Sequence, residues 1–214
     1  YERNDIFGHE IVELFEIKFD PYLEISKEQR DIRLAEIMDR VNFNMTQVKE
    51  IIDDTVIRRF FGLVNATLRT NYYQSSINGG FKGYLSFKFD SSKVPGLPLP
   101  LPFAEIFVYS TRVEAIHLRG GKVARGGLRW SDRQEDFRIE VLGLMKAQMT
   151  KNAVIVPVGS KGGFVVKGDL TQMSRDDAQK EAIECYKIFL RGLLDITDNV
   201  ISGKIHHPLN AVIY

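Results

Sequence analysis

Apolar and polar positions follow two different periods along this chain. Up to about residue 80, apolar residues recur every three to four positions, as on one side of an amphipathic helix. This pattern predicts three helices, over Ile11–Phe19, from Ser26 to about Val41, and from Met45 to about Leu68. We therefore expect residues 1–80 to form a helical N-terminal segment that packs on the rest.

From Lys82 onward, short runs with a period of two replace the helical pattern. The segment Gly83–Asp90 alternates as a half-buried strand does, with Leu85, Phe87 and Phe89 on one face. Four prolines make Ser91–Pro102 a loop. Further strands are predicted over 104–110, 113–119, 153–157 and 164–167, and helices over 135–150 and about 175–199. Residues 81–214 should therefore form an α/β domain, a mixed β-sheet flanked by helices.

Composition limits the classes of function. A chain of 214 residues that is 44% hydrophobic can bury one core and carry a helical extension. The net charge of +1 argues against a nucleic-acid partner. The sequence also contains no apolar stretch of about 18 residues, so we expect no membrane partner. The single cysteine, Cys185, excludes an internal disulfide and suits the cytoplasm. His206 and His207 have neither the spacing nor the third ligand of a metal site.

The segment from Lys151 to Lys161 is the most informative part of the chain. A cation, an apolar run, a glycine-rich exit and a second cation follow one another. We expect a buried strand that ends in a turn, where the backbone can approach a ligand closely. Lysines at the ends of strands are often simply solvated. Together, however, these two frame a site for an anion.

The predicted helix over 135–150 directs two polar side chains toward the expected anion site. Its apolar stripe, extended by one and two turns, puts Gln148 and Lys151 on the core-facing side. Buried polar groups need partners, and a bound carboxylate would satisfy both. Upstream, Arg125 precedes the pair Gly126-Gly127. The stripe itself consists of Phe137, Val141, Leu144 and Met145.

Three ordered motifs resemble those of a known family. Arg125-Gly-Gly-Leu-Arg-Trp, Gln148-Met-Thr-Lys-Asn and Pro157-Val-Gly-Ser-Lys-Gly-Gly look like the substrate-domain motifs of the glutamate, leucine, phenylalanine and valine dehydrogenases. The surrounding residues, such as Glu105-Ile-Phe-Val-Tyr-Ser, are closer to the very large NAD-specific glutamate dehydrogenases of bacteria. The resemblance covers most of Thr46–Tyr214.

The resemblance implies a role for each matched residue. Lys161 matches the catalytic lysine, which polarises the substrate carbonyl and activates water. Lys151 and Gln148 match the groups that hold the α-carboxylate.

Two departures from the smaller hexameric enzymes stand out. Arg125, beside Gly126 and Gly127, replaces a lysine that holds the side-chain carboxylate; it keeps the charge and adds a planar fork suited to carboxylates. The stretch from Lys151 to Lys161 is also two residues shorter, which puts its loop geometry in doubt.

The reaction implied is the oxidative deamination of L-glutamate to 2-oxoglutarate and ammonia with NAD. The sequence has no Gly-x-Gly-x-x-Gly motif, so we expect NAD to bind a domain outside this chain. The chain also ends at Tyr214, just before the point where the family places an acidic residue. We therefore expect this fragment to be inactive alone, within a full-length protein that forms a homo-oligomer.

Two alternatives stay open at this stage. The same chemistry could act on an apolar amino acid, although Arg125 favours a dicarboxylate. The cations could instead belong to a non-catalytic anion-binding or oligomerisation module. Replacing Lys161 by alanine would abolish turnover in an enzyme, but would only weaken binding in such a module.

Overall fold

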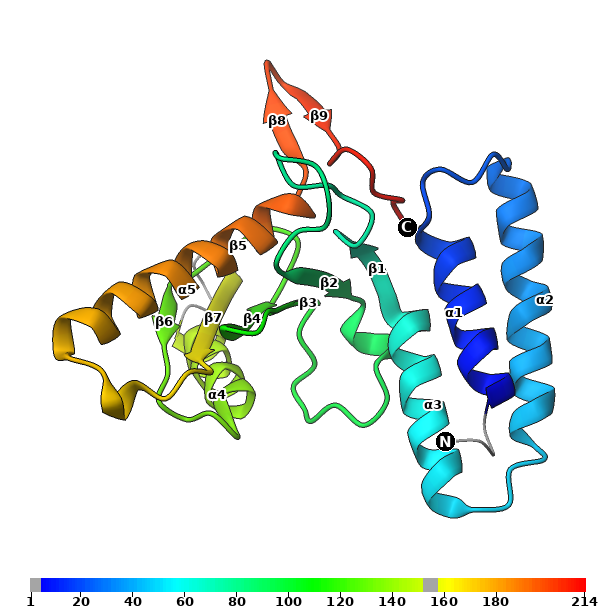
Figure 1. The fold of residues 1–214 in the computed structure, drawn as a ribbon, viewed down its shortest axis with the longest axis horizontal. Helices are drawn as coiled ribbons and strands as arrows, with labels where there is room; N and C mark the ends of the chain where they lie inside the picture. The colour runs from blue at the N-terminus through cyan, green and yellow to red at the C-terminus, as the bar shows by residue number, and fades with distance from the viewer. Residues whose placement is uncertain (1–4, 152–157) are drawn as a thin grey trace.

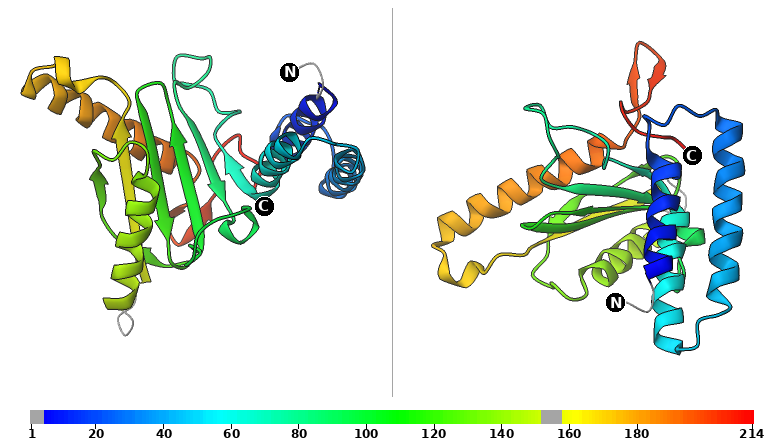
Figure 2. Two further views of the ribbon diagram at one scale, coloured as in Figure 1. Left: turned by 90° about the horizontal axis from the view of Figure 1, so that it is seen from below. Right: turned by 45° about the vertical axis from the view of Figure 1, so that its right-hand side comes forward.

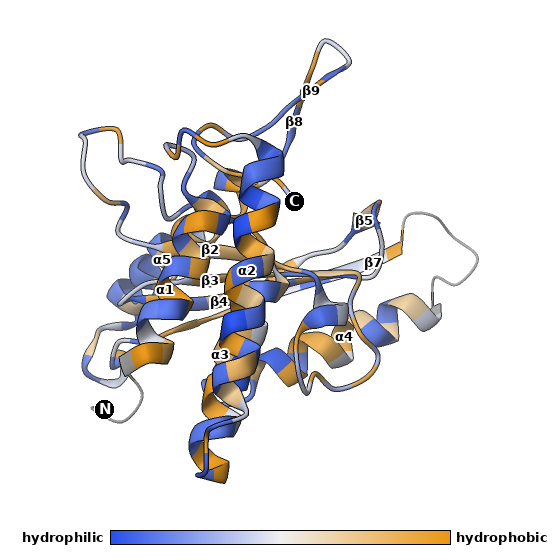
Figure 3. Ribbon diagram, turned by 90° about the vertical axis from the view of Figure 1, so that its right-hand side faces the viewer, coloured by the Kyte–Doolittle hydropathy of each residue, from blue (hydrophilic) through white to orange (hydrophobic). Residues whose placement is uncertain are grey.

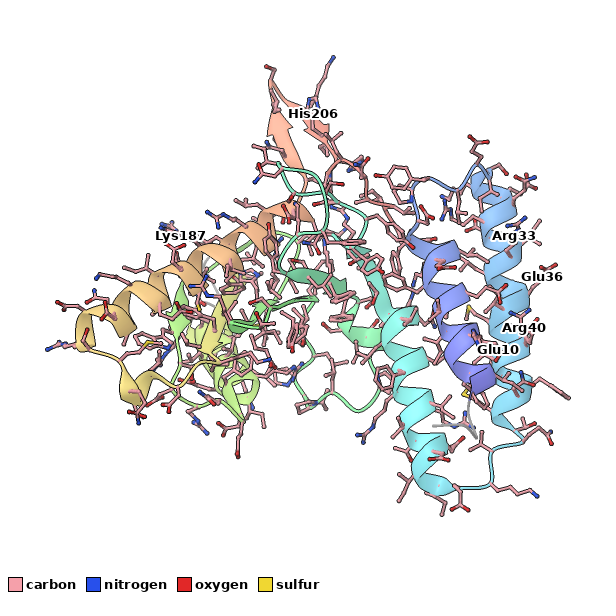
Figure 4. The ribbon with its side chains drawn as sticks, in the orientation of Figure 1. Glu10, Arg33, Glu36, Arg40, Lys187 and His206 are labelled. Carbon is pink, nitrogen blue, oxygen red and sulfur yellow. The ribbon has the colours of Figure 1, made fainter. Side chains whose placement is uncertain are left out.

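The computed structural model describes residues 5–151 and 158–214. It begins with three helices, α1 (Asp5–Phe19), α2 (Lys27–Met45) and α3 (Ile51–Ala66), which stand together at one end of the molecule (Figure 1). Their inner sides form an apolar core that includes Leu14 and Val41. Glu10 of α1 and Arg40 of α2 also face each other, with an ion pair of 3.0 Å (Figure 4).

The expected helix from Met45 to Leu68 is wrong at both ends. The preceding helix continues to Met45, and a new one starts only at Ile51. The hydroxyl of Thr46 donates to the carbonyl of Phe43 (2.7 Å), and such side-chain bonds to the backbone compete with helix continuation. At the other end, the β-branched Thr67 begins a strand. Neither break is marked by glycine or proline.

Seven strands form one mixed sheet in the order β1-β2-β3-β4-β7-β5, with β6 also paired to β7. Pairing is antiparallel from β1 to β7, whereas β5 and β6 run parallel to β7. The strands are β1 (Thr67–Thr70), β2 (Leu85–Phe89), β3 (Ala104–Tyr109), β4 (Val113–Arg119), β5 (Ala124–Arg125), β6 (Leu128–Trp130) and β7 (Val158–Val166). A boundary between two domains at residue 80 stays a proposal. Strand β1 precedes residue 80 but already belongs to the sheet.

Two helices cover opposite faces of the sheet. Figure 2 shows α5 (Arg175–Asp195) on one side and α4 (Phe137–Lys151) on the other. Cys185 of α5 is fully buried in the first interface. Met145 of α4 is fully buried in the second, and α4 carries apolar and polar positions along its length (Figure 3). The expected α/β fold, with a mixed sheet and N-terminal helices, is confirmed.

The alternation predicted for β2 is present, but the buried position is not the expected one. Leu85, Phe87 and Phe89 share a face and are only partly buried, whereas Ser86 on the other face is fully buried. Ser86 lies under α5, where Gly192 leaves room for it. On the aromatic face, α4 packs against β4 and β7 rather than β2.

The predicted helix near the C-terminus ends at Asp195, and a hairpin follows that the sequence analysis missed. Its strands, β8 (Asn199–Ile201) and β9 (Lys204–His206), project from the molecule (Figure 1). Ser202 and Gly203 form its turn with positive φ angles, as two-residue hairpin turns require. Two short 3-10 turns, η2 (Ser91–Lys93) and η3 (Leu170–Gln172), complete the described elements. Within the described residues, no helix has the length and apolar character needed to cross a membrane.

An ion pair between the buried Arg69 and the largely exposed Asp198 ties the first strand to the segment after α5. The Arg69 guanidinium donates to both carboxylate oxygens of Asp198 (2.7 and 3.1 Å) and to the carbonyl of Ile196. His207 Nδ1 lies 2.8 Å from the same carboxylate. The bonds from Arg69, and then from His207, lower the pKa of Asp198 to about 2. The pair therefore holds β1 against the C-terminal end of α5.

Asp198→Asn should lower the free energy of unfolding at pH 7 by about 1–2 kcal/mol, because the buried Arg69 loses a charged partner whose interaction solvent partly screens. The folded-state pKa lies below the ordinary value of 3.8, so this stabilisation is present above that value and is lost as the pH falls toward 2. Denaturant unfolding at pH 7 and pH 3 would measure the loss of stability in the variant. Asp39→Asn is the control, because Asp39 is exposed on α2. A difference between wild type and variant that does not shrink at pH 3 would contradict this assignment.

Candidate functional site

The glycine-rich segment that contains Lys161 is a strand, which corrects the expected turn. Val158–Val166 forms one continuous strand, β7, paired with β4 along its length. Its glycines are needed for close packing: a methyl group on Gly163 would lie 2.5 Å from the Val141 side chain of α4. The short strand predicted at 164–167 is the end of β7. The strand predicted at 153–157 lies outside the described residues.

Strand register places Lys161 on the face of the sheet that α4 covers. Lys161 is directly opposite Leu118, which is fully buried in the core beneath α4. Directly paired residues point to the same face, so the partly buried Lys161 side chain lies on the α4 side.

Arg125 reaches the same face from the neighbouring strand. β5 pairs in parallel with β7, with Arg125 beside Gly159. Gly159 and Lys161 are two residues apart on one strand and therefore share a face, which Arg125 shares with them. The Arg125 side chain is exposed. The sheet thus brings two of the three predicted cations to one side of the molecule.

Gln148 joins α4 to β5. Its Nε2 donates to the carbonyl of Arg125 (2.9 Å), and its side chain packs against Gly159. This confirms that the apolar stripe of the helix carries Gln148 toward the sheet. Its Oε1 is buried and has no hydrogen-bond partner among residues 5–151 and 158–214. The second N–H of Nε2 remains for a ligand, and Oε1 is an acceptor that the described residues leave unused.

Gly126, the first residue of the pair Gly126-Gly127, allows the segment from β5 to β6 to approach β7 closely. A methyl group on Gly126 would sit 1.4 Å from the carbonyl oxygen of Ser160, whereas one on Gly127 would meet nothing within 4 Å. The carbonyl of Gly127 accepts from the amide of Gly162 (3.2 Å). The first glycine is therefore required by contact with the neighbouring backbone, and the second is not.

Lys151 is the last residue of α4, and its side chain lies outside the described residues. The expectation that it joins Gln148 on the inner face stays a prediction. The roles assigned to Arg125, Gly126, Gly127, Gln148 and Lys161 are likewise still predictions, because a shared face does not identify a ligand.

Two ion pairs that the sequence analysis left off the site hold α4 in place. Arg138 donates to both carboxylate oxygens of Glu105 on β3 (3.0 and 2.5 Å). Glu140 accepts from Arg129 of β6 (3.1 Å) and from the buried hydroxyl of Ser131 (2.5 Å). These bonds anchor the first turns of the helix whose last turns carry Gln148. The arginines were visible in the sequence, but their partners on other elements were not.

Gly126→Ala should destabilise the protein by about 1–3 kcal/mol, the usual cost of overpacking, because β5 must move away from Ser160. Gly127→Ala is the matched control and should change stability little, since its added methyl group meets no neighbour within 4 Å. Thermal or denaturant unfolding of both variants would compare them. Equal effects of the two substitutions would show that the close approach of β5 to β7 is not required.

Comparison with known proteins identifies the family. Residues 40–214 match the family model described as "Bacterial NAD-glutamate dehydrogenase, catalytic domain". The chain is 53% identical over 203 residues to the NAD-specific glutamate dehydrogenase of Halomonas elongata, covering 95% of this chain and 12% of that protein. The corresponding protein of Pseudomonas aeruginosa is 53% identical, with 96% and 13% covered, and that of Mycobacterium tuberculosis is 49% identical, with 89% and 12% covered.

The chain thus spans about an eighth of the length of these relatives. Its match to the family model extends from the end of α2 through the whole sheet, both covering helices and the C-terminal hairpin. The Arg125, Gln148 and Lys161 motifs all fall inside that range. The chain belongs to the bacterial NAD-glutamate dehydrogenase family, and its residues 40–214 lie within the catalytic domain of that family.

Proposed function

We propose that the full-length protein converts L-glutamate, NAD and water to 2-oxoglutarate, ammonia and reduced NAD, and that this chain supplies the substrate-binding part. The observation that carries the proposal is the placement of Arg125, Gln148 and Lys161 on one face of the sheet, joined by the bond from Gln148 to the Arg125 carbonyl. Membership of the family supports it.

In this proposal, Arg125 and Gln148 divide the recognition of glutamate. The exposed guanidinium of Arg125 would bind the side-chain carboxylate through two parallel hydrogen bonds. The free N–H of Gln148 would donate to the α-carboxylate, together with Lys151 at the end of the same helix. A diacid is favoured over an apolar amino acid because an apolar side chain would leave the Arg125 cation without a partner.

Lys161 would act on the reacting carbon. During hydrolysis of the imino acid formed after hydride loss, negative charge develops on the attacking oxygen, and a fixed ammonium group stabilises it. The same lysine would orient the attacking water. Its place in a central strand, opposite the buried Leu118, restricts where its stem can lie and so limits reorganisation during the reaction.

The nicotinamide cofactor would bind elsewhere in the full-length protein. Bound NAD supplies the acceptor for the substrate hydride. The sequence of this chain has no Gly-x-Gly-x-x-Gly turn between a strand and a helix, so its residues do not fit a dinucleotide site. We accordingly propose that these 214 residues alone do not turn over glutamate. A cytoplasmic location and a homo-oligomeric state stay predictions.

Lys161→Met in the full-length protein should lower kcat for glutamate oxidation by about 100- to 1000-fold, because the developing charge loses its cation. Binding of 2-oxoglutarate, measured by calorimetry, should be affected far less. Lys187→Met is the control, since Lys187 is exposed on α5 and paired with Glu184 (2.6 Å, Figure 4). Wild-type turnover in the Lys161 variant would exclude the catalytic role.

Arg125→Leu should lower kcat/KM for glutamate by about 100-fold or more, through the loss of a charged hydrogen-bonded partner. The kcat/KM for L-norvaline, which lacks the side-chain carboxylate, should fall much less. Steady-state assays of the full-length variant with both amino acids would measure the change in preference. A parallel loss for the two substrates would mean that Arg125 does not read the side-chain carboxylate.

A further inference from the structure

The opposite face of the sheet, near the end of α5, carries a group of cations that Lys161 does not share. Arg69 on β1 and Lys88 on β2 are directly opposite each other. Like charges in directly opposed positions destabilise a sheet unless an anion lies between them. Lys88 is partly buried and forms no ion pair or hydrogen bond among the described residues. Arg69 is neutralised by Asp198, so Lys88 is the cation of the two whose charge lacks a partner among the described residues.

Arg119 of β4 adds a third cation to the same face. Lys88 is paired with Ile106, and Arg119 with Ala104, so both long side chains stand on the face that α5 packs against. One Arg119 nitrogen donates to the carbonyl of Lys122 (2.6 Å), and the other guanidinium donors have no partner in the described structure.

Two carboxylates on neighbouring segments, Asp198 and Asp90, are already occupied. Asp198 accepts both bonds from Arg69 and also contacts His207. Asp90 at the end of β2 accepts from the amide and the hydroxyl of Ser92, which starts a short helical turn. Burial, followed by the proximity of Arg69 and then Arg119, lowers the pKa of Lys88, and Asp198 opposes this only in part.

His117 supplies a further unsatisfied group on the same row of the sheet. It is paired with Ile106 from the other side, so Ile106 separates it from Lys88. Its Nδ1 is buried and has no hydrogen-bond partner in the described part of the chain. Burial, and then Arg119, lower the pKa of His117 to about 4, so the imidazole is neutral near pH 7 and Nδ1 can carry a proton to donate.

We propose that Lys88 and Arg119, backed by Arg69, bind a phosphate or carboxylate group of a small anionic molecule on the sheet face opposite Lys161. An ammonium and a guanidinium group together offer several charge-assisted donors to one oxyanion. The anion would balance Lys88 and the free guanidinium donors of Arg119, since Asp198 already balances Arg69. Because Lys161 faces α4, this site is separate from the proposed substrate site and does not depend on it.

Isothermal titration of the protein with inorganic pyrophosphate and with succinate tests the proposal and distinguishes the two anion chemistries. Wild type should show saturable binding of at least one anion, weakened by added salt. Lys88→Met, which keeps the apolar stem, and Arg119→Met should each weaken binding by about tenfold or more. Arg33→Met is the control, because Arg33 is an exposed cation on the distant α2 (Figure 4).

The melting temperature gives a second test, because Lys88→Met should change Tm in one way without a bound anion and in another way with it. In low-salt buffer without a binding anion, Lys88→Met should raise Tm, because it removes a partly buried charge opposite Arg69. With pyrophosphate or succinate, whichever binds, wild type should gain in Tm and the variant should not. The proposal is overturned if neither anion binds saturably, if Lys88→Met and Arg33→Met bind alike, or if Lys88→Met lowers Tm without anion.

Discussion

Close main-chain packing along β7 is the constraint on which the rest of the structure depends. Gly126 of the β5–β6 segment touches the backbone of Ser160, and Gly159 lies directly beneath Gln148 of α4. A side chain at either glycine would separate these elements. Because they can approach to this distance, β5 and α4 meet over one strand, and the carbonyl of Arg125 comes within hydrogen-bonding distance of Gln148.

The alternation of side chains across the sheet then creates two chemically separate surfaces. Odd-numbered positions of β7, including Lys161, face α4, and the even-numbered ones, such as Phe164, face α5. The same rule places Lys88 and Arg119 on the α5 side. The net charge of +1 does not reveal the group of cations on each face, because carboxylates elsewhere on the chain balance their charge in the total. Electrostatic function in this protein is therefore a property of particular faces.

Elements with a strong local pattern were predictable, and those that depend on distant contacts were not. The strands β3 and β4 agree with the periodicity, and so does the apolar stripe of α4 except that Leu142 is buried in the core instead of Leu144. The glycines around Lys161 suggested a turn, because the sequence does not show the helix and strands that pack against them. Ser86 is buried for a similar reason: Gly192, more than a hundred residues away, makes room for it. The hairpin after α5 was missed, although Ser202-Gly203 is a recognisable turn pair.

From the order of its residues alone, this chain specifies the approximate positions of its helices, the strands β2, β3 and β4, and the motifs that assign it to a dehydrogenase family. Those features depend on neighbours a few positions apart, whose periodicity is local. Which cations share a face is decided by the pairing of distant strands, and a shift of one residue in that pairing would move every side chain to the other side. The grouping of Arg125 with Lys161, and of Lys88 with Arg119, therefore exists only in the folded sheet.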